Sequence, residues 1–253
     1  MLDYDGTLAP FADDRMQAAL YPCVAERLVE LRQLAETRLV FVSGRPAREL
    51  PLLLPANLDA EIWGSHGREQ LLPNGVYKFL PPTVEQTQAL VSFERMLSEA
   101  GYETAIEKKL GSLAIHSRGL AESRARELKT LAEGLFAKVV SDSQSPVSLE
   151  WLPFDGGVEV RGSDCSKATA IKQILDDESG EVVVAYLGDD ETDEDAFRAL
   201  AGRGLRVLVR GEPRVTLADL WIRPPAELLA FLDRWLATIS IHRNNAKREE
   251  SNS

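Results

Sequence analysis

Three short apolar runs that are rich in β-branched residues predict strands that are covered on both faces, as in a parallel sheet: Arg38–Val42, Val182–Leu187 and Leu205–Val209. Apolar residues recur at helical spacing before, between and after these runs. They form three stripes: Val24, Leu28, Leu31 and Ala35; Ala168, Ile171, Ile174 and Leu175; and Leu228, Leu229, Leu232, Trp235 and Leu236. Strands that alternate with helices predict an α/β fold with a doubly wound parallel sheet.

The middle of the chain breaks this alternation. Its pattern predicts a helix, two strands, a second helix and two more strands, at Val84–Ala100, Tyr102–Glu107, Ser112–Ser117, Leu120–Phe136, Lys138–Ser141 and Val147–Trp151. We therefore expect a smaller inserted α+β domain over 82–155, within a core formed by 1–81 and 156–241. The polar segment 242–253 lacks periodicity and is expected to be a disordered tail.

Composition excludes several classes of function. The 253 residues include 29 basic and 40 acidic side chains, and the net charge of −11 disfavours binding to nucleic acid or anionic membranes. The chain has neither an apolar run of about 18 residues nor a signal-like start. Its two cysteines, Cys23 and Cys165, match no metal-binding or redox spacing. A cytoplasmic location fits these features.

Two carboxylates stand close together near the start of the chain. Asp3 and Asp5 are separated by one residue and followed by Gly6, which permits a sharp turn. If Asp3 ends a strand, both carboxylates lie at the carboxyl edge of the sheet, where ligands bind in open α/β folds. Asp and Gly are also common turn residues, so this pattern alone does not decide between a site and a turn.

A second acidic cluster favours a site. Asp189, Asp190 and the acids of 191–195 follow the apolar run Val182–Leu187 directly. So many neighbouring acids require either full solvation or a hard cation, and Mg²⁺ prefers carboxylate oxygens together with a substrate phosphate. Acids also favour the first turn of a helix, and part of the cluster fits that role.

Two further elements suit an anion. Ser43, Gly44 and Arg45 follow the first apolar run, where a hydroxyl, backbone N–H groups and a helix start would meet. Lys167 lies in the first turn of a predicted helix, where a cation opposes the helix dipole. This unfavourable placement indicates an anion nearby, although a solvated lysine needs no such explanation.

Along the chain the four elements come in the order Asp-x-Asp-Gly-Thr, Ser-Gly-Arg, Lys, Gly-Asp-Asp. Together they resemble the haloacid dehalogenase superfamily of phosphatases, and the inserted unit resembles the cap of its sugar-phosphatase branch. More specifically, the sequence is similar to the trehalose-6-phosphate phosphatase family. The resembling segments are Leu2-Asp3-Tyr4-Asp5-Gly6-Thr7-Leu8, Gly64-Ser65-His66-Gly67, Glu107-Lys108-Lys109, Leu113-Ala114-Ile115-His116-Ser117-Arg118, Val158-Glu159-Val160-Arg161, Ser166-Lys167 and Gly188-Asp189-Asp190-Glu191-Thr192-Asp193-Glu194.

The resemblance implies hydrolysis of trehalose 6-phosphate to trehalose and phosphate, the last step of trehalose biosynthesis, through an aspartyl-phosphate. It implies that Asp3 is the nucleophile, that Asp5 is the acid and base, and that Lys167 assists them. Mg²⁺ would be held by Asp3, the Asp5 carbonyl and Asp189, supported by Asp190 or Asp193. Ser43, Gly44 and Lys167 would bind the phosphoryl oxygens, and Arg45 would contact the sugar or phosphate.

For the inserted unit, the resemblance implies that Glu107, Lys109 and Glu159 bind the sugar. Glu107 and Lys109 are two apart on a predicted strand and so face the same side, although a solvated ion pair across strands fits as well. The chain departs from the family at Ser117, where tyrosine is usual. It also has only Met1 and Leu2 before Asp3, whereas a strand needs about five residues. We therefore expect the central strand to be mostly missing, with the sequence beginning downstream of the true start.

Two other functions stay open. The same chemistry could act on sucrose phosphate or a glycosylglycerate phosphate. Alternatively, the chain could be a non-catalytic module that associates with trehalose-phosphate synthase.

Overall fold

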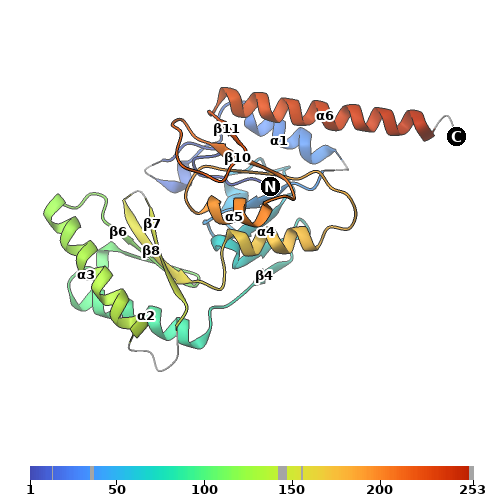
Figure 1. Cartoon of the computed structure of the whole chain (residues 1–253). Helices are drawn as coiled ribbons and strands as arrows, with labels where there is room; N and C mark the ends of the chain where they lie inside the picture. Colours follow the sequence, from blue (N-terminus) through green and yellow to red (C-terminus); the bar gives the residue numbers. More distant parts are fainter. Residues whose placement is uncertain (13, 35–36, 142–146, 155, 251–253) are drawn as a thin grey trace. The chain divides into compact units, whose positions relative to one another are not determined.

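The computed structural model describes residues 1–250 except 13, 35–36, 142–146 and 155. The chain divides into two compact units. The first consists of Met1–Phe79 and Ser166–Ser253, and the second of Leu80–Cys165 (Figure 1).

The sheet of the first unit has two parts. On one side β1 pairs in parallel with β2, and β3 and β4 follow in antiparallel order; these strands are Val40–Val42, Glu61–Gly64, Glu69–Leu71 and Tyr77–Phe79. On the other side three parallel strands run in the order β11, β10, β9; their bounds are Leu220–Ile222, Leu205–Val209 and Ala185–Gly188. Parallel strands place their carboxyl ends at one edge, which is the edge expected to carry the chemistry.

The first three residues join the two parts. Leu2 forms isolated parallel bridges with Phe41 and with Leu187. The Leu2 N–H donates to the Val40 carbonyl at 2.8 Å, and the Asp3 N–H donates to the Leu187 carbonyl at 2.9 Å. Asp3 therefore stands at the carboxyl edge in the middle of the sheet, although no full strand forms there.

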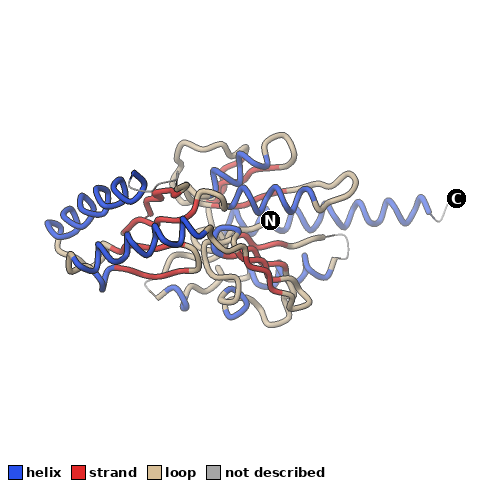
Figure 2. Tube along the Cα trace, turned by 90° about the horizontal axis from the view of Figure 1, so that it is seen from below, coloured by secondary structure: helices blue, strands red, loops and turns tan. Residues whose placement is uncertain are grey.

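Helices cover both faces of this sheet. α1 packs against α6, and α4 packs against α5 (Figures 1 and 2). Their bounds are Val24–Gln33, Ala226–Glu250, Lys167–Asp176 and Asp193–Leu200. Three 3₁₀ helices, η1, η2 and η3, lie at Arg15–Gln17, Leu50–Leu52 and Ser65–Gly67. Because helical stripes bury Leu28, Ile171 and Leu228 completely, the sheet is shielded on both sides.

The second unit is an antiparallel sheet with two helices. The strand order is β5-β6-β8-β7, and α2 packs beside α3 (Figure 2). The elements, including the 3₁₀ helix η4, are α2 Val84–Glu99, η4 Glu103–Ala105, β5 Ile106–Lys109, β6 Ser112–His116, α3 Glu122–Ser141, β7 Leu149–Phe154 and β8 Gly157–Gly162. A capping box of Thr83 and Gln86 fixes the start of α2.

Two predictions about this unit are wrong. Lys138–Ser141 is not a strand but the last turn of α3, because Val139 is buried on the helical face that packs into the unit. The unit also ends at Cys165 rather than at 155, because β8 lies between β6 and β7 and completes the sheet. The order αββαββ is retained with the last two strands displaced along the chain.

The prediction of a disordered tail over 242–253 is also corrected in part. The backbone of α6 is helical to Glu250, and 251–253 lie outside the described residues. A polar sequence without periodicity can continue a helix that has already been nucleated by a packed segment, since propagation costs much less than nucleation.

Candidate active site

Asp3 is buried at the carboxyl edge of the sheet, with only 4% of its surface exposed. One carboxylate oxygen, Oδ1, accepts from Lys167 Nζ at 2.9 Å. The other, Oδ2, accepts from the Thr7 hydroxyl at 3.3 Å. The two contacts fix the carboxylate in one orientation.

Lys167 begins α4 immediately after the capping residue Ser166. Its ammonium donates to Asp3 and also to Asp193 Oδ1 at 2.7 Å, and 3% of its surface is exposed. Burial alone would lower the pKa of Lys167, but Asp193 and Asp3 raise it well above its usual value. Two buried carboxylates of the protein itself therefore explain why a cation tolerates this end of a helix.

The acidic loop after β9 is organised around Asp193, the first residue of α5. Its Oδ2 accepts from the backbone N–H groups of Asp189 at 2.9 Å and Asp190 at 3.1 Å. Its Oδ1 accepts from the Tyr186 hydroxyl at 2.5 Å, in addition to Lys167. Asp193 thus holds the loop in place, whereas the Asp190 carboxylate accepts from the Thr192 N–H and hydroxyl.

Carboxylate oxygens of Asp3, Asp189 and Asp193 lie within 4.8 Å of one another. Burial, together with the neighbouring carboxylates, raises the pKa of Asp3 to about 8 and that of Asp189 well above its usual value. When these three buried acids are ionised, the charge of Lys167 alone does not balance their negative charge. A hard divalent cation with oxygen ligands would supply it, so this donor set fits Mg²⁺.

Gly6 allows the two acidic segments to approach closely. Its φ is +76°, and a Cβ there would stand 2.1 Å from Asp189 Oδ2. Any side chain at this position would displace the Asp189 carboxylate. The glycine of the Asp-x-Asp-Gly segment therefore has a packing role as well as a conformational one.

Asp5 forms a bidentate ion pair with Arg45. The Nε and Nη2 atoms of Arg45 donate to the two Asp5 oxygens, each at 2.6 Å. The Arg45 N–H also donates to the buried Ser43 hydroxyl at 3.2 Å. Nη1 of Arg45 is buried and has no hydrogen-bond partner among the described residues. Gly44 closes this loop, because a Cβ on it would stand 2.8 Å from the His66 ring.

The second unit holds a polar cluster on one face of its sheet. Lys109 Nζ donates to Glu159 Oε2 at 2.8 Å, and the Ser112 hydroxyl donates to Glu159 Oε1 at 2.6 Å. Glu107 lies opposite Ala114, which in turn lies opposite Glu159. Since residues opposite each other share a face, the expectation that Glu107 and Lys109 face the same side is confirmed.

Sequence reasoning missed the groups that support the acidic loop from behind. Tyr186 lies inside β9, and Arg210 and Arg214 follow β10. Arg214 Nη2 donates to the Asp190 carbonyl at 2.5 Å, and Arg210 Nη1 donates to the Asp189 carbonyl at 3.3 Å. No local motif marks these residues, because their partners lie 7 to 24 positions away in the sequence.

The family model described as trehalose-phosphatase matches residues 1–213. The chain belongs to the trehalose-phosphatase family. This match spans both units up to the loop after β10, and therefore includes each of the four elements found in the sequence.

Curated relatives agree with this assignment. The chain is 30% identical over 251 residues to a probable trehalose-phosphate phosphatase 4 of Oryza sativa, covering 92% of this chain and 64% of the relative. It is 29% identical to the trehalose-phosphate phosphatase of Mycobacterium tuberculosis, covering 92% of this chain and 59% of the relative. The chain thus spans less than two thirds of the length of these relatives.

Solved structures confirm the fold class. A trehalose-6-phosphate phosphatase of Aspergillus fumigatus superimposes with a TM-score of 0.64 at 23% identity, covering 94% of this chain and 92% of the other. The C-terminal domain of the Candida albicans trehalose-6-phosphate phosphatase gives a TM-score of 0.73 at 20% identity, covering 93% and 90%. No helix among the described residues has the length and apolar character needed to cross a membrane.

Proposed function

We propose that this chain hydrolyses trehalose 6-phosphate to trehalose and phosphate through a phosphoryl group carried on Asp3. The observation that supports this most is the buried cluster of Asp3, Asp189 and Asp193 around Lys167, at the carboxyl edge of a parallel sheet. Family membership supports the substrate. Burying four charged groups costs free energy unless the groups form ion pairs with one another and bind a ligand.

In the first half-reaction a carboxylate oxygen of Asp3 attacks phosphorus, and the bond from phosphorus to the sugar oxygen breaks. Asp5 gives a proton to the leaving sugar oxygen. In the second half-reaction Asp5 takes a proton from water, whose oxygen attacks the phosphorus and releases Asp3 from phosphate. Atoms and charges balance, and Asp5 returns to its starting state.

The other groups are proposed to bind the phosphoryl group and the metal ion. Lys167 and the Ser43 hydroxyl, with the Gly44 N–H, are proposed to hold the phosphoryl oxygens. Asp3, Asp189 and the Asp5 carbonyl, with Asp190 in support, are proposed to bind Mg²⁺. When bound, the ion offsets the repulsion between the attacking carboxylate and the phosphate.

Arg45 is proposed to bind the substrate as it enters. Its guanidinium holds both Asp5 oxygens, so Asp5 can carry a proton to the sugar only after this ion pair opens. The buried Nη1 atom supplies a donor for a substrate oxygen. An incoming phosphate or sugar hydroxyl can therefore draw Arg45 away from Asp5.

The sugar is proposed to bind at Glu107, Lys109 and Glu159. The two carboxylates accept hydrogen bonds from hydroxyl groups in fixed directions, and the ammonium donates. Lys109 and Glu159 are mostly buried and paired before any sugar arrives, which orients both.

The test measures phosphate release with Mg²⁺ from trehalose 6-phosphate, sucrose phosphate and a glycosylglycerate phosphate, in the wild type and in Glu107→Ala and Lys109→Ala. We expect trehalose 6-phosphate to be preferred and both variants to lose that preference. Preference for another sugar, with the variants unimpaired, would refute the substrate. Absence of turnover on every substrate would refute catalysis and favour a non-catalytic module. Association with trehalose-phosphate synthase and a cytoplasmic location stay predictions.

A further inference from the structure

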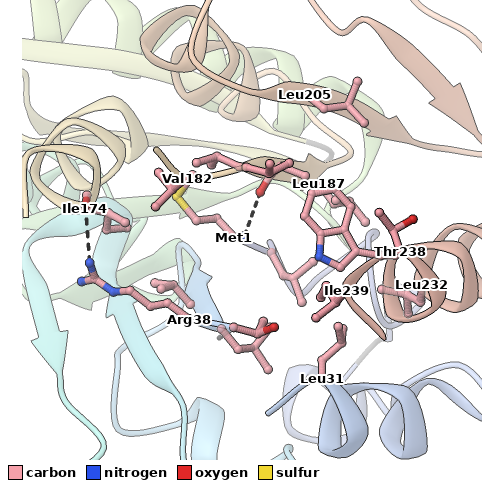
Figure 3. A pocket seen from close by; sticks show the side chains of 18 of the residues that line it. Met1, Leu31, Arg38, Ile174, Val182, Leu187, Leu205, Leu232, Thr238 and Ile239 are labelled. Atoms are coloured by element: carbon pink, nitrogen blue, oxygen red, sulfur yellow. Dashed lines mark hydrogen bonds between the residues drawn. The ribbon is translucent and has the colours of Figure 1, made fainter. Parts of the chain in front are cut away.

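The proposed sugar site needs an apolar surface as well as charged groups. A pyranose ring carries hydroxyl groups around its edge and C–H groups on its faces, and small-molecule sites combine a few placed polar groups with mainly apolar and aromatic walls. A groove of about 660 Å³ beside Met1 is lined mainly by apolar side chains, but its lining includes none of the residues proposed to bind the sugar or the phosphate (Figure 3). An apolar surface that serves the sugar should instead lie in the second unit, beside Glu107, Lys109 and Glu159.

The side chains on the polar face of this sheet form rows that cross its strands. Glu107 and Glu159 belong to one row. The next row consists of His116 on β6, Gly157 on β8 and Phe154 on β7. Because Gly157 and Glu159 are two apart on β8, both rows lie on the same face, about 7 Å from each other along the strand. An aromatic pair therefore borders the proposed sugar-binding carboxylates.

The ring of Phe154 lies over Gly157. A Cβ on Gly157 would stand 2.5 Å from Phe154 Cζ and 2.9 Å from Phe154 Cε2, so the ring fills the space that a side chain on Gly157 would take. The ring also contacts His116, with ring centroids 5.5 Å apart and an angle of 65° between the two planes. Even so, 37% of the Phe154 surface is exposed. Phe154 and His116 thus form an aromatic wall next to Glu159, part of which is open to a ligand.

The same wall is tied to the other proposed sugar-binding carboxylate. His116 Nε2 and Glu107 Oε2 form a hydrogen bond of 2.8 Å, and both side chains are partly exposed. His116 therefore contacts the Phe154 ring and orients Glu107, whereas Lys109 orients Glu159. A ligand on this face of the sheet meets two oriented carboxylates and, in the neighbouring row, a flat apolar ring.

From these contacts we propose that Phe154 is a specificity-determining residue, whose ring packs against the C–H face of the substrate's sugar ring while Glu107, Lys109 and Glu159 bind the hydroxyl groups. Charged groups alone would serve any polyol phosphate. A flat ring beside them favours a cyclic sugar, because a pyranose presents several C–H groups in one plane and an open chain does not. This inference rests on the proposed function and deepens it, since it states what kind of sugar the site selects.

The first experiment measures kinetics on trehalose 6-phosphate and on sorbitol 6-phosphate, an open-chain polyol phosphate, together with Tm. Phe154→Leu keeps an apolar side chain but removes the flat ring, so KM for trehalose 6-phosphate should rise about 3–10-fold with kcat unchanged. Phe154→Tyr keeps the ring and should keep the wild-type KM. Neither variant should change kinetics on sorbitol 6-phosphate.

Phe79→Leu is the matched control. Phe79 lies at the end of β4 in the first unit and is 38% exposed, almost the same as Phe154. The same substitution there should leave KM for both substrates unchanged. If Phe154 only covered Gly157, Phe154→Leu would lower Tm and impair both substrates equally, and that result would overturn the proposal.

The second experiment needs no turnover. In NMR spectra of the chain with ¹³C-labelled phenylalanine, the ring signal that Phe154→Leu removes belongs to Phe154. Trehalose should shift this signal and sorbitol should not, and neither should shift the signal of Phe79. An unmoved Phe154 signal, in a chain that turns over trehalose 6-phosphate and is impaired by Lys109→Met, would overturn this inference and leave the proposed function intact. A shift with trehalose in a chain without turnover would refute the proposed catalysis and still support the aromatic wall.

Discussion

Replacement of Gly6 by alanine tests the contact that brings the two acidic segments together. The new Cβ would stand 2.1 Å from Asp189 Oδ2, so the carboxylate has to move by about 1 Å to restore contact distance. A displacement of that size in a catalytic group can cost on the order of 100-fold in rate. We therefore expect kcat/KM to fall by about that factor, equivalent to about 2.7 kcal/mol of transition-state stabilisation.

Gly202→Ala provides the matched control. Gly202 has a φ of +75°, almost the same as Gly6, and a Cβ on it would meet no atom within 4 Å. Both variants carry the same left-handed backbone cost of about 1–2 kcal/mol, or a loss of about 2–8 °C in Tm. Only Gly6→Ala should also lose activity and the rise in Tm caused by Mg²⁺.

The assay measures phosphate release from trehalose 6-phosphate and thermal unfolding, each with and without Mg²⁺. If Gly6→Ala matched Gly202→Ala in kcat/KM and in its response to Mg²⁺, the position of Asp189 would not control the site. The assignment of Asp189 to the metal would then be wrong.

Three further predictions concern charge. The pKa of Asp3 is about 8 in the folded protein, against 3.8 for a free carboxyl, so folding favours the protonated form. Without a cation, the free energy of unfolding should therefore decline as pH rises from about 4 to about 8. Mg²⁺ should reverse this, so the gain in Tm from Mg²⁺ should grow over that window, and a pH-independent gain would contradict the assignment. Arg45→Lys should lower kcat/KM about tenfold, because an ammonium lacks the planar guanidinium whose Nη1 is proposed to bind the substrate; unchanged kinetics would exclude that role. Lys109→Met should raise KM for trehalose 6-phosphate by about 10–100-fold and leave p-nitrophenyl phosphate turnover intact, because a charged hydrogen bond contributes about 1.5–3 kcal/mol; equal loss on both substrates would indicate a folding defect.

Three strands of the parallel core, β1, β9 and β10, were predictable because their runs are mostly apolar and lie among helices with clear apolar stripes, whereas β2 and β11 were not predicted. The strand ends were not, because pairing depends on neighbours that lie far away in sequence. The predicted strands begin at Arg38 and Val182, whereas β1 begins at Val40 and β9 at Ala185. Val139 illustrates the reverse case: a β-branched residue was assigned to a strand, whereas burial on one face keeps it in α3.

The candidate site was predictable where chemistry lies in short segments that directly follow strands, as with Asp3 and Asp189. The contacts by which other elements hold the acidic loop were not predictable. Tyr186, Arg210 and Arg214 reach the acidic loop only after the sheet has formed, and no spacing in the sequence records their partners. Lys167 lies between these cases, since its unusual place in a helix indicated an anion but could not show that the anions are Asp3 and Asp193.

The central claim is that Asp3 carries the phosphoryl group, and it can be tested by mass spectrometry of acid-quenched Asp5→Asn after reaction with p-nitrophenyl phosphate and Mg²⁺. This leaving group needs no proton, whereas the loss of Asp5 should slow attack by water, so the intermediate should accumulate. The account predicts one phosphoryl group on Asp3, and none when Asp3→Asn is added. Release of phosphate by the doubly substituted chain, or a phosphoryl group on another residue, would contradict it.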